Sequence, residues 1–356
     1  MVKKIIISAI ITITACSPAV IFAGQKDTLL QNIYNSRGDL QAAFESTTWL
    51  AKPNSAAGLM LDLPDWASQY GWKEYAELAS YKPLSNDGIP NRIDQREIES
   101  SITSAAYVVI DKSTGIPLTV KQEHRKWPMA SITKLMTAHT VMQHDIPLTN
   151  VHSVKNYDNV GGAKLYVSDG DTFTVNDLFY ATLVASANNA ANALSRTTGL
   201  SKSAFVKKMN ANAKEMNLQH TTFVDPTGIE VENFSTPMEI ARMAREVLKN
   251  DYIKKYSTTA TKHINVLNQG TEKKLTNTNW MLWKPQYDDI YVTGGKTGFL
   301  YESKWNLVVT LRPNAQDVDR ELLVVALGAD SRAQSFNDAE KLAQWAWDVY
   351  RWEKQN

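Results

Sequence analysis

The spacing of apolar and polar residues predicts strands early and late in the chain and helices between them. Residues 107–110 and 117–120 are apolar, β-rich runs separated by the turn-forming segment 111–115, a pattern typical of a β-hairpin. Further strand-like runs occupy residues 291–293, 307–311 and 322–327. We therefore expect an α+β fold in which one mainly antiparallel sheet joins early and late strands around a helical subdomain.

The predicted helices carry apolar side chains at three- and four-residue spacing. The first opens near Pro128 and Ser131 and is apolar on most sides, as expected for a helix buried in a core. The other predicted helices are residues 175–183, 187–197, 202–216, 237–248 and 336–352.

The first residues predict export. Lys3 and Lys4 precede an apolar run that is near the length of a signal-peptide core and too short to span a bilayer comfortably. We expect a signal peptide over residues 1–23 and a periplasmic product. The alternative is a lipoprotein signal over residues 1–15 that leaves a lipid anchor on Cys16. Since Cys16 is the only cysteine, neither route leaves a disulfide within one mature chain.

Residues 24–100 form a predicted N-terminal extension of unknown role, followed by the main domain over residues 101–356. The extension carries Trp49, Trp66 and Trp72 among prolines, with one plausible helix at 72–81. Packing of these aromatic rings against the main domain is the plainer interpretation. Stacking on glycan sugars is the alternative.

Charge and histidine spacing exclude several classes of function. The net charge of +1 gives no electrostatic reason to expect nucleic acid or a general membrane-surface partner. The six histidines show no metal-ligand spacing, so we predict no metal and no cofactor. The sequence Gly295-Lys296-Thr297 is not a phosphate loop, because Ile290 stands where that motif requires glycine.

A serine and a lysine at one helical turn of spacing carry the first chemical signal. Lys134 follows Ser131 by three residues, about 4.5 Å along a helix and on nearly the same face. A serine becomes a nucleophile when a neighbouring base removes its proton. A free lysine has a pKa near 10.4, so we expect burial and the nearby Lys296 cation to lower that of Lys134.

Two more motifs follow in chain order, Ser186-Ala187-Asn188 and Lys296-Thr297-Gly298. A second Ser-x-Asn, at residues 335–337, comes after the Lys-Thr-Gly triplet and is interpreted as structural. This order resembles that of the penicillin-binding proteins and class A β-lactamases. Around the motifs, residues 130–138, 223–229, 277–279 and 294–299 are similar to low-molecular-weight penicillin-binding proteins of the D-alanyl-D-alanine carboxypeptidase and endopeptidase family. The resemblance covers about residues 101–350 and implies a β-lactamase/transpeptidase-like fold.

The resemblance also implies a role for each motif. Ser131 would form an acyl-enzyme while Lys134 accepts its proton, and Ser186 would relay protons to the leaving group. Asn188 would hold the substrate amide and Lys134. Further along the chain, the implied roles are carboxylate binding by Lys296 and Thr297, an oxyanion hole formed by the backbone N–H groups of Ser131 and Phe299, and close approach of the substrate at Gly298.

Four functions remain open. An endopeptidase that cuts peptidoglycan cross-links is preferred, because the chain ends at Asn356 without the second β-rich domain of many carboxypeptidases. A DD-carboxypeptidase that removes terminal D-Ala is the nearest alternative. A β-lactamase is disfavoured, since no Glu-x-x-Leu-Asn string lies between Ser186 and Lys296, and we expect slow deacylation and covalent inhibition by penicillin. A non-catalytic wall-binding module is the fourth.

Overall fold

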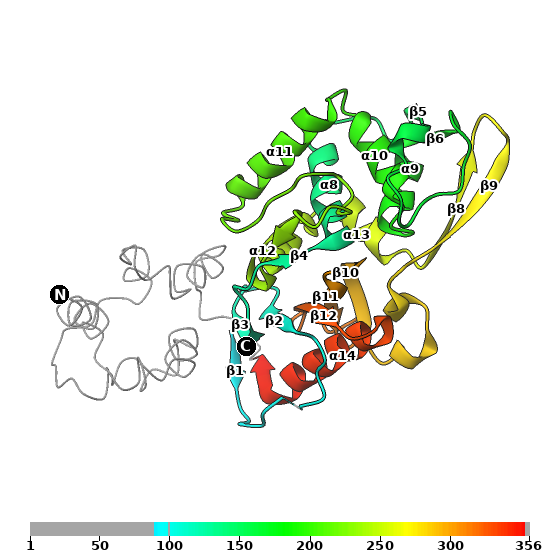
Figure 1. Ribbon diagram of the computed structural model, residues 1–356. Helices are drawn as coiled ribbons and strands as arrows, with labels where there is room; N and C mark the ends of the chain where they lie inside the picture. Colours follow the sequence, from blue (N-terminus) through cyan, green and yellow to red (C-terminus); the bar gives the residue numbers. More distant parts are fainter. Residues whose placement is uncertain (1–88, 99, 353–356) are drawn as a thin grey trace, which may run out of the picture. The chain divides into compact units, whose positions relative to one another are not determined.

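The computed structural model describes residues 89–98 and 100–352 (Figure 1). The predicted signal peptide, the three tryptophans of the extension and the helix at 72–81 lie outside the described residues. The chain divides into two compact units, of which the first comprises Met1–Gln95, Ser113–Pro117 and Val349–Asn356. In its described part, strand β1 (Pro90–Arg92) pairs antiparallel with β13 (Tyr350–Trp352).

The second unit, Arg96–Lys112 with Leu118–Asp348, is built on a five-stranded sheet in the order β10-β11-β12-β2-β3. The register makes the β10–β11, β11–β12 and β12–β2 pairs antiparallel. Every residue of the central strand β12 is buried, which explains its continuous apolar run. The strands are β2 (Ala106–Asp111), β3 (Pro117–Lys121), β10 (Tyr291–Leu300), β11 (Lys304–Arg312) and β12 (Leu322–Ala329).

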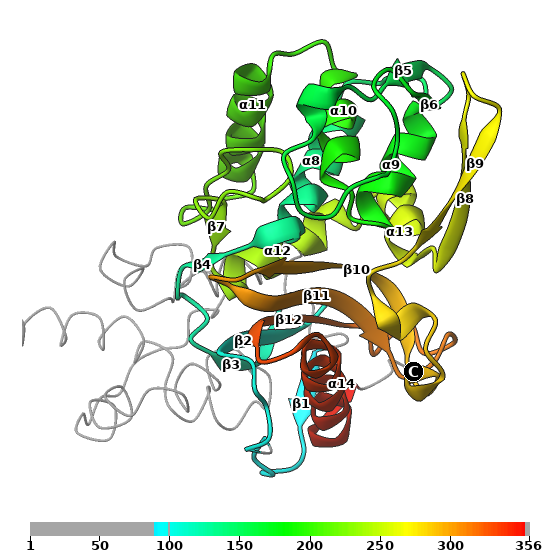
Figure 2. The same cartoon turned by 45° about the vertical axis from the view of Figure 1, so that its right-hand side comes forward.

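Helices cover both faces of this sheet. Helix α12 packs against β2, β11 and β12, and α14 lies on the opposite face (Figure 2). Helices α8 to α11 gather on the side of α12, and α13 contacts β10. Their bounds are α8 (Thr133–Met142), α9 (Val175–Leu183), α10 (Asn188–Arg196), α11 (Lys202–Glu215), α12 (Pro237–Val247), α13 (Asp251–Thr258) and α14 (Arg332–Val349).

Short strand pairs and 3-10 turns connect these elements. In the described part of the second unit, three two-stranded antiparallel pairs lie outside the main sheet: β4 (Trp127–Pro128) with β7 (Phe234–Ser235), β5 (Val151–Ser153) with β6 (Thr172–Thr174), and β8 (Thr261–Val266) with β9 (Thr271–Thr276). The turns are η1 (Ala130–Ile132), η2 (Asn156–Asp158), η3 (Trp280–Leu282) and η4 (Pro285–Tyr287).

The α+β class and the antiparallel sheet are confirmed, and several element boundaries were wrong. Ser131 lies in the 3-10 turn η1, so the α-helix begins two residues later, at Thr133. The last helix starts at Arg332 and ends at Val349, and the next three residues form β13 instead. The β8–β9 hairpin was not predicted, because its mostly exposed, polar residues give no apolar signal.

Candidate active site

Lys134 lies at the centre of a hydrogen-bond cluster that includes Ser131. The Lys134 Nζ donates to Ser131 Oγ at 2.8 Å, to Asn188 Oδ1 at 2.7 Å and to the Thr227 carbonyl at 2.6 Å. The lysine is fully buried in the first turn of α8. Burial lowers the pKa of Lys134 to about 7, and the Asp225 carboxylate opposes that shift. An amine with this pKa can accept a proton at neutral pH, as a base for a serine must.

The backbone around Ser131 is held in a conformation that ordinary residues avoid. Ala130 has a φ of 51°, and such left-handed non-glycine residues cluster at functional sites. Gly228 lies directly against it, with a φ of 79°. A Cβ on Gly228 would stand 1.9 Å from the Ala130 carbonyl oxygen, so only glycine fits there.

Asp225 holds together the turn formed by residues 225–233, which carries Thr227 and Gly228. Its Oδ1 accepts from the Thr227 N–H at 2.5 Å and the Gly228 N–H at 2.9 Å. Its Oδ2 accepts from the Glu230 N–H at 3.1 Å and from Asn233 Nδ2 at 2.5 Å. Hydrogen bonds to the ionised form favour it, which is why the pKa of Asp225 is lowered despite burial. The carboxylate therefore fixes the carbonyl that Lys134 contacts.

Two further contacts tie this turn to the segment around Ser131. The Met129 N–H donates to the Asn233 carbonyl at 2.8 Å, on the N-terminal side of the serine. On the C-terminal side, Thr137 Oγ1 donates to the Pro226 carbonyl at 2.6 Å. The turn thus contacts both flanks of Ser131.

The second lysine approaches from the sheet. Lys296, on β10, is only 2% exposed and donates from Nζ to Ser186 Oγ at 2.9 Å. Its pKa is lowered well below the usual range by burial first, and then by repulsion from Lys134 and Arg332. Ser186 has a φ of 58°, the second strained non-glycine residue among the predicted site residues and their immediate neighbours.

Strand β10 passes close to the Ser131 segment. A Cβ on Gly298 would lie 2.8 Å from the Met129 carbonyl oxygen and 3.3 Å from the Ser131 nitrogen. The absence of a side chain there lets the two backbones approach. Thr297 lies one residue earlier and donates from Oγ1 to Thr278 Oγ1 at 2.6 Å. Arg332 Nη2 donates to the Thr278 carbonyl at 2.7 Å, so the Arg332 cation contacts the same threonine whose hydroxyl accepts from Thr297.

The structure thus brings the three motifs to one place. Ser131, Lys134 and Asn188 share hydrogen bonds, Ser186 and Lys296 share another, and Gly298 lies against Ser131. The sequence predicted no chemical role for Asp225, Thr227, Thr278 or Arg332. Thr227 contributes a backbone carbonyl, which no side-chain pattern can reveal.

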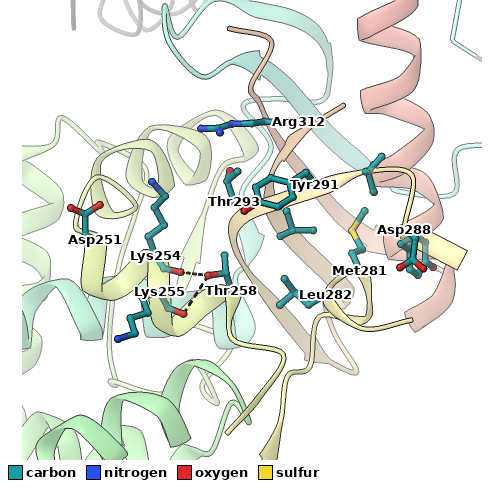
Figure 3. A pocket seen from close by; sticks show the side chains of 13 residues that line it. Asp251, Lys254, Lys255, Thr258, Met281, Leu282, Asp288, Tyr291, Thr293 and Arg312 are labelled. Carbon is teal, nitrogen blue, oxygen red and sulfur yellow. Dashed lines mark hydrogen bonds between the residues drawn. The ribbon is translucent and has the colours of Figure 1, made fainter. Parts of the chain in front are cut away.

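The cavity in Figure 3 does not coincide with this cluster. It has a volume of about 660 Å³ and is bordered by α13, by residues 281–293 and by Arg312. Tyr291 and Thr293 line it from the start of β10, whereas Lys296 lies further along the same strand. Among the residues that the structure describes, no group of three or more histidine, cysteine, aspartate or glutamate side chains could hold a metal ion.

A buried lysine hydrogen-bonded to a serine, with a second buried lysine on strand β10, is the arrangement expected of an acyl-transfer site of the serine type. The model of the D-alanyl-D-alanine carboxypeptidase family, Peptidase S11, matches residues 93–331. The chain therefore belongs to this family, and it is a serine peptidase of the low-molecular-weight penicillin-binding protein class.

Relatives of two kinds are about equally similar to the chain. It is 29% identical to a D-alanyl-D-alanine carboxypeptidase of Bacillus subtilis, covering 72% of this chain and 65% of that protein. It is also 29% identical to a D-alanyl-D-alanine endopeptidase of Pseudomonas aeruginosa, covering 76% of this chain and 83% of that protein. The fold matches the crystal structure of the Streptomyces K15 DD-transpeptidase with a TM-score of 0.64, at 23% identity over 71% of this chain and 100% of that one.

Proposed function

We propose that this protein is an exported serine DD-peptidase that cleaves D-alanyl-D-alanine-type bonds in peptidoglycan peptides through an acyl-enzyme on Ser131. The observation that carries the proposal is the 2.8 Å hydrogen bond between Ser131 Oγ and a fully buried Lys134 whose pKa lies at about 7. Within the described part of the chain, no helix is both long enough and apolar enough to cross a bilayer.

The contacts support one role for each group. Ser131 Oγ attacks the substrate carbonyl carbon as its proton passes to Lys134, and the C–N bond breaks when the leaving amine takes up a proton. The backbone N–H groups of Ser131 and Phe299 stabilise the oxyanion. A water molecule then releases the acyl group from Ser131.

The remaining motif residues orient the substrate and the base. Asn188 fixes Lys134 through its Oδ1 and holds the substrate amide. Lys296 and Thr297 bind the terminal carboxylate, an anion that raises the pKa of Lys296 and favours its charged form. Ser186, whose Oγ accepts a hydrogen bond from Lys296, relays the proton to the leaving amine. Gly298 gives the substrate backbone room beside β10.

Two finer activities remain within this class, and we favour the endopeptidase over the carboxypeptidase. Relatives bearing either name are 29% identical to this chain, so they do not choose between the two activities. A β-lactamase needs a group that activates the deacylating water. Among the described residues, no carboxylate is hydrogen-bonded to Ser131 or Lys134, which supports slow deacylation.

Digestion of purified muropeptides separates these functions. Loss of cross-linked dimers identifies an endopeptidase, loss of terminal D-Ala from pentapeptides a carboxypeptidase, and rapid penicillin turnover a β-lactamase. Mass spectrometry after penicillin treatment should place the adduct on Ser131, and the Ser131→Ala variant should lose both adduct and activity. An unmodified Ser131 together with unchanged muropeptides would indicate the non-catalytic module.

A further inference from the structure

Aromatic side chains form a ridge at the strand that carries Lys296 and Thr297. The ridge consists of five residues, of which Trp283, Phe299 and Tyr301 are exposed and Trp280 and Trp305 are half-buried. Tyr301 is 90% exposed, Trp283 42% and Phe299 40%. Exposed aromatic residues gathered in one place on a protein surface mark interaction sites more often than isolated ones do.

The rings contact one another across the β10–β11 hairpin. Phe299 lies 5.5 Å from Tyr301 and 4.3 Å from Trp305, measured between ring centroids. Phe299 and Trp305 are also direct cross-strand partners in the sheet register. The sheet therefore fixes part of this surface before any ligand arrives, which lowers the entropic cost of binding.

Two cationic side chains lie against the tryptophans of the ridge near η3. The Arg332 guanidinium lies 5.9 Å from the Trp305 ring and 4.7 Å from the Trp280 ring. Lys284 Nζ lies 3.2 Å from the Trp280 ring and 5.7 Å from the Trp283 ring. Aromatic faces interleaved with cations suit a ligand that combines flat apolar surfaces with negative charge.

The ridge begins where the proposed carboxylate site ends. Phe299 follows the Lys296–Gly298 motif directly in β10, and Arg332 is joined to Thr297 through Thr278. In the proposed reaction, the carboxylate belongs to the leaving group. A ligand portion that extends beyond the carboxylate would therefore reach the ridge, whereas a single released D-alanine would not.

We propose that this ridge binds the muropeptide released from a peptidoglycan cross-link, with its sugar rings on the aromatic faces and its acidic stem peptide beside Arg332 and Lys284. The inference rests on the proposed DD-peptidase function and deepens it, because the surface favours cross-linked substrates over single chains. Binding energy from this remote part of the substrate would assist cleavage of cross-links only.

Kinetics on three substrates test the ridge: a disaccharide-bearing cross-linked dimer, the same dimer without sugars, and a monomeric pentapeptide. For Tyr301→Ala, we expect kcat/KM on the sugar-bearing dimer to fall about tenfold, an effect typical of a contributing interface residue below the hot-spot range. The loss should be smaller on the sugar-free dimer and below about twofold on the pentapeptide. Tyr301→Phe, which keeps the ring, should behave as the wild type.

Tyr252→Ala is the matched control, because Tyr252 is 52% exposed on α13 and lies outside the ridge. Equal losses on all three substrates, or none on the sugar-bearing dimer, would overturn the proposal. An equal loss on the two dimers would refute the placement of sugars on the rings.

Binding without turnover separates this inference from the proposed function. Calorimetry with a disaccharide-tetrapeptide and the inactive Ser131→Ala protein should show weaker binding when Tyr301→Ala is added. If the wild type cleaves nothing but this difference persists, the DD-peptidase proposal fails and the ridge stands. If the wild type cleaves cross-links and Tyr301→Ala changes neither binding nor rate, only the ridge proposal fails.

Discussion

The pH dependence of acylation tests the assignment of Lys134 as the base. Because the pKa of this buried amine is about 7, half of the free enzyme carries neutral Lys134 at that pH. From pH 7 to pH 5, the neutral fraction falls to about a fiftieth of its value, whereas from pH 7 to pH 9 it only doubles, to about one. A lysine with the ordinary pKa would instead gain about a hundredfold between pH 7 and pH 9.

Stopped-flow measurement of labelling by a fluorescent penicillin gives the second-order acylation rate, which reports groups of the free enzyme. We expect a rate that rises to about pH 8 and then levels off. A continued rise of about tenfold per unit up to pH 10 would show that Lys134 is charged in the resting enzyme. That result would refute the lowered pKa of Lys134, and with it the assignment of a neutral amine that is ready to act as the base at pH 7.

Removing the Asp225 charge should move this profile in a defined direction. The carboxylate raises the pKa of Lys134, so Asp225→Asn should shift the midpoint of the acid limb below that of the wild type. The added amide hydrogens would face the donors Glu230 and Asn233, which costs about 3 kcal/mol of stability. Asp171→Asn is the control, because Asp171 is a buried carboxylate hydrogen-bonded to Ser168 and Gln269. A midpoint that stays fixed in Asp225→Asn, or moves upward, would contradict this electrostatic coupling.

Two further predictions concern the turn and the buried amine. Gly228→Ala should abolish penicillin labelling and lower the melting temperature, because the new Cβ would collide with the Ala130 carbonyl. Gly270→Ala is the control: Gly270 also has a positive φ but has open space around it, so the substitution should cost only about 1 kcal/mol of stability. Equal effects of the two substitutions would refute the steric argument. Between pH 7 and pH 10, the unfolded chain binds a proton at Lys134 that the folded chain lacks, so stability should rise by up to about 1.4 kcal/mol per pH unit. Urea unfolding should show a smaller rise in Lys134→Met, and an unchanged slope would exclude the buried neutral amine.

The sequence predicted most of the sheet, because its strands are buried and therefore continuously apolar. Residues 322–327, for example, lie within β12, which is buried throughout. The first strand-like part of β10 was visible at residues 291–293, but its continuation through Gly294 and Gly295 was not. Those glycines carry no β propensity, and they are there because the strand bulges between Val292 and Gly294 and packs tightly.

In the candidate site, the sequence predicted the side chains that carry the motifs but not the contacts made through the main chain. Spacing placed Ser131 beside Lys134, and motif order suggested that Asn188 and Lys296 would join them. Asp225 gave no chemical signal of its own, because its effect passes through the Thr227 backbone carbonyl. Contacts made through main-chain atoms depend on the fold, so sequence patterns do not reveal them.

The site lowers the stability of the folded chain, which explains why so many hydrogen bonds hold it together. A fully buried amine whose pKa has fallen to about 7 destabilises the folded chain by several kcal/mol at neutral pH, and Lys296 adds to that cost in the same direction. Ala130 adds backbone strain. The buried sheet and the turn held by Asp225 oppose these terms. Because the same turn supplies the carbonyl that positions Lys134, its hydrogen bonds serve both stability and the orientation of the base.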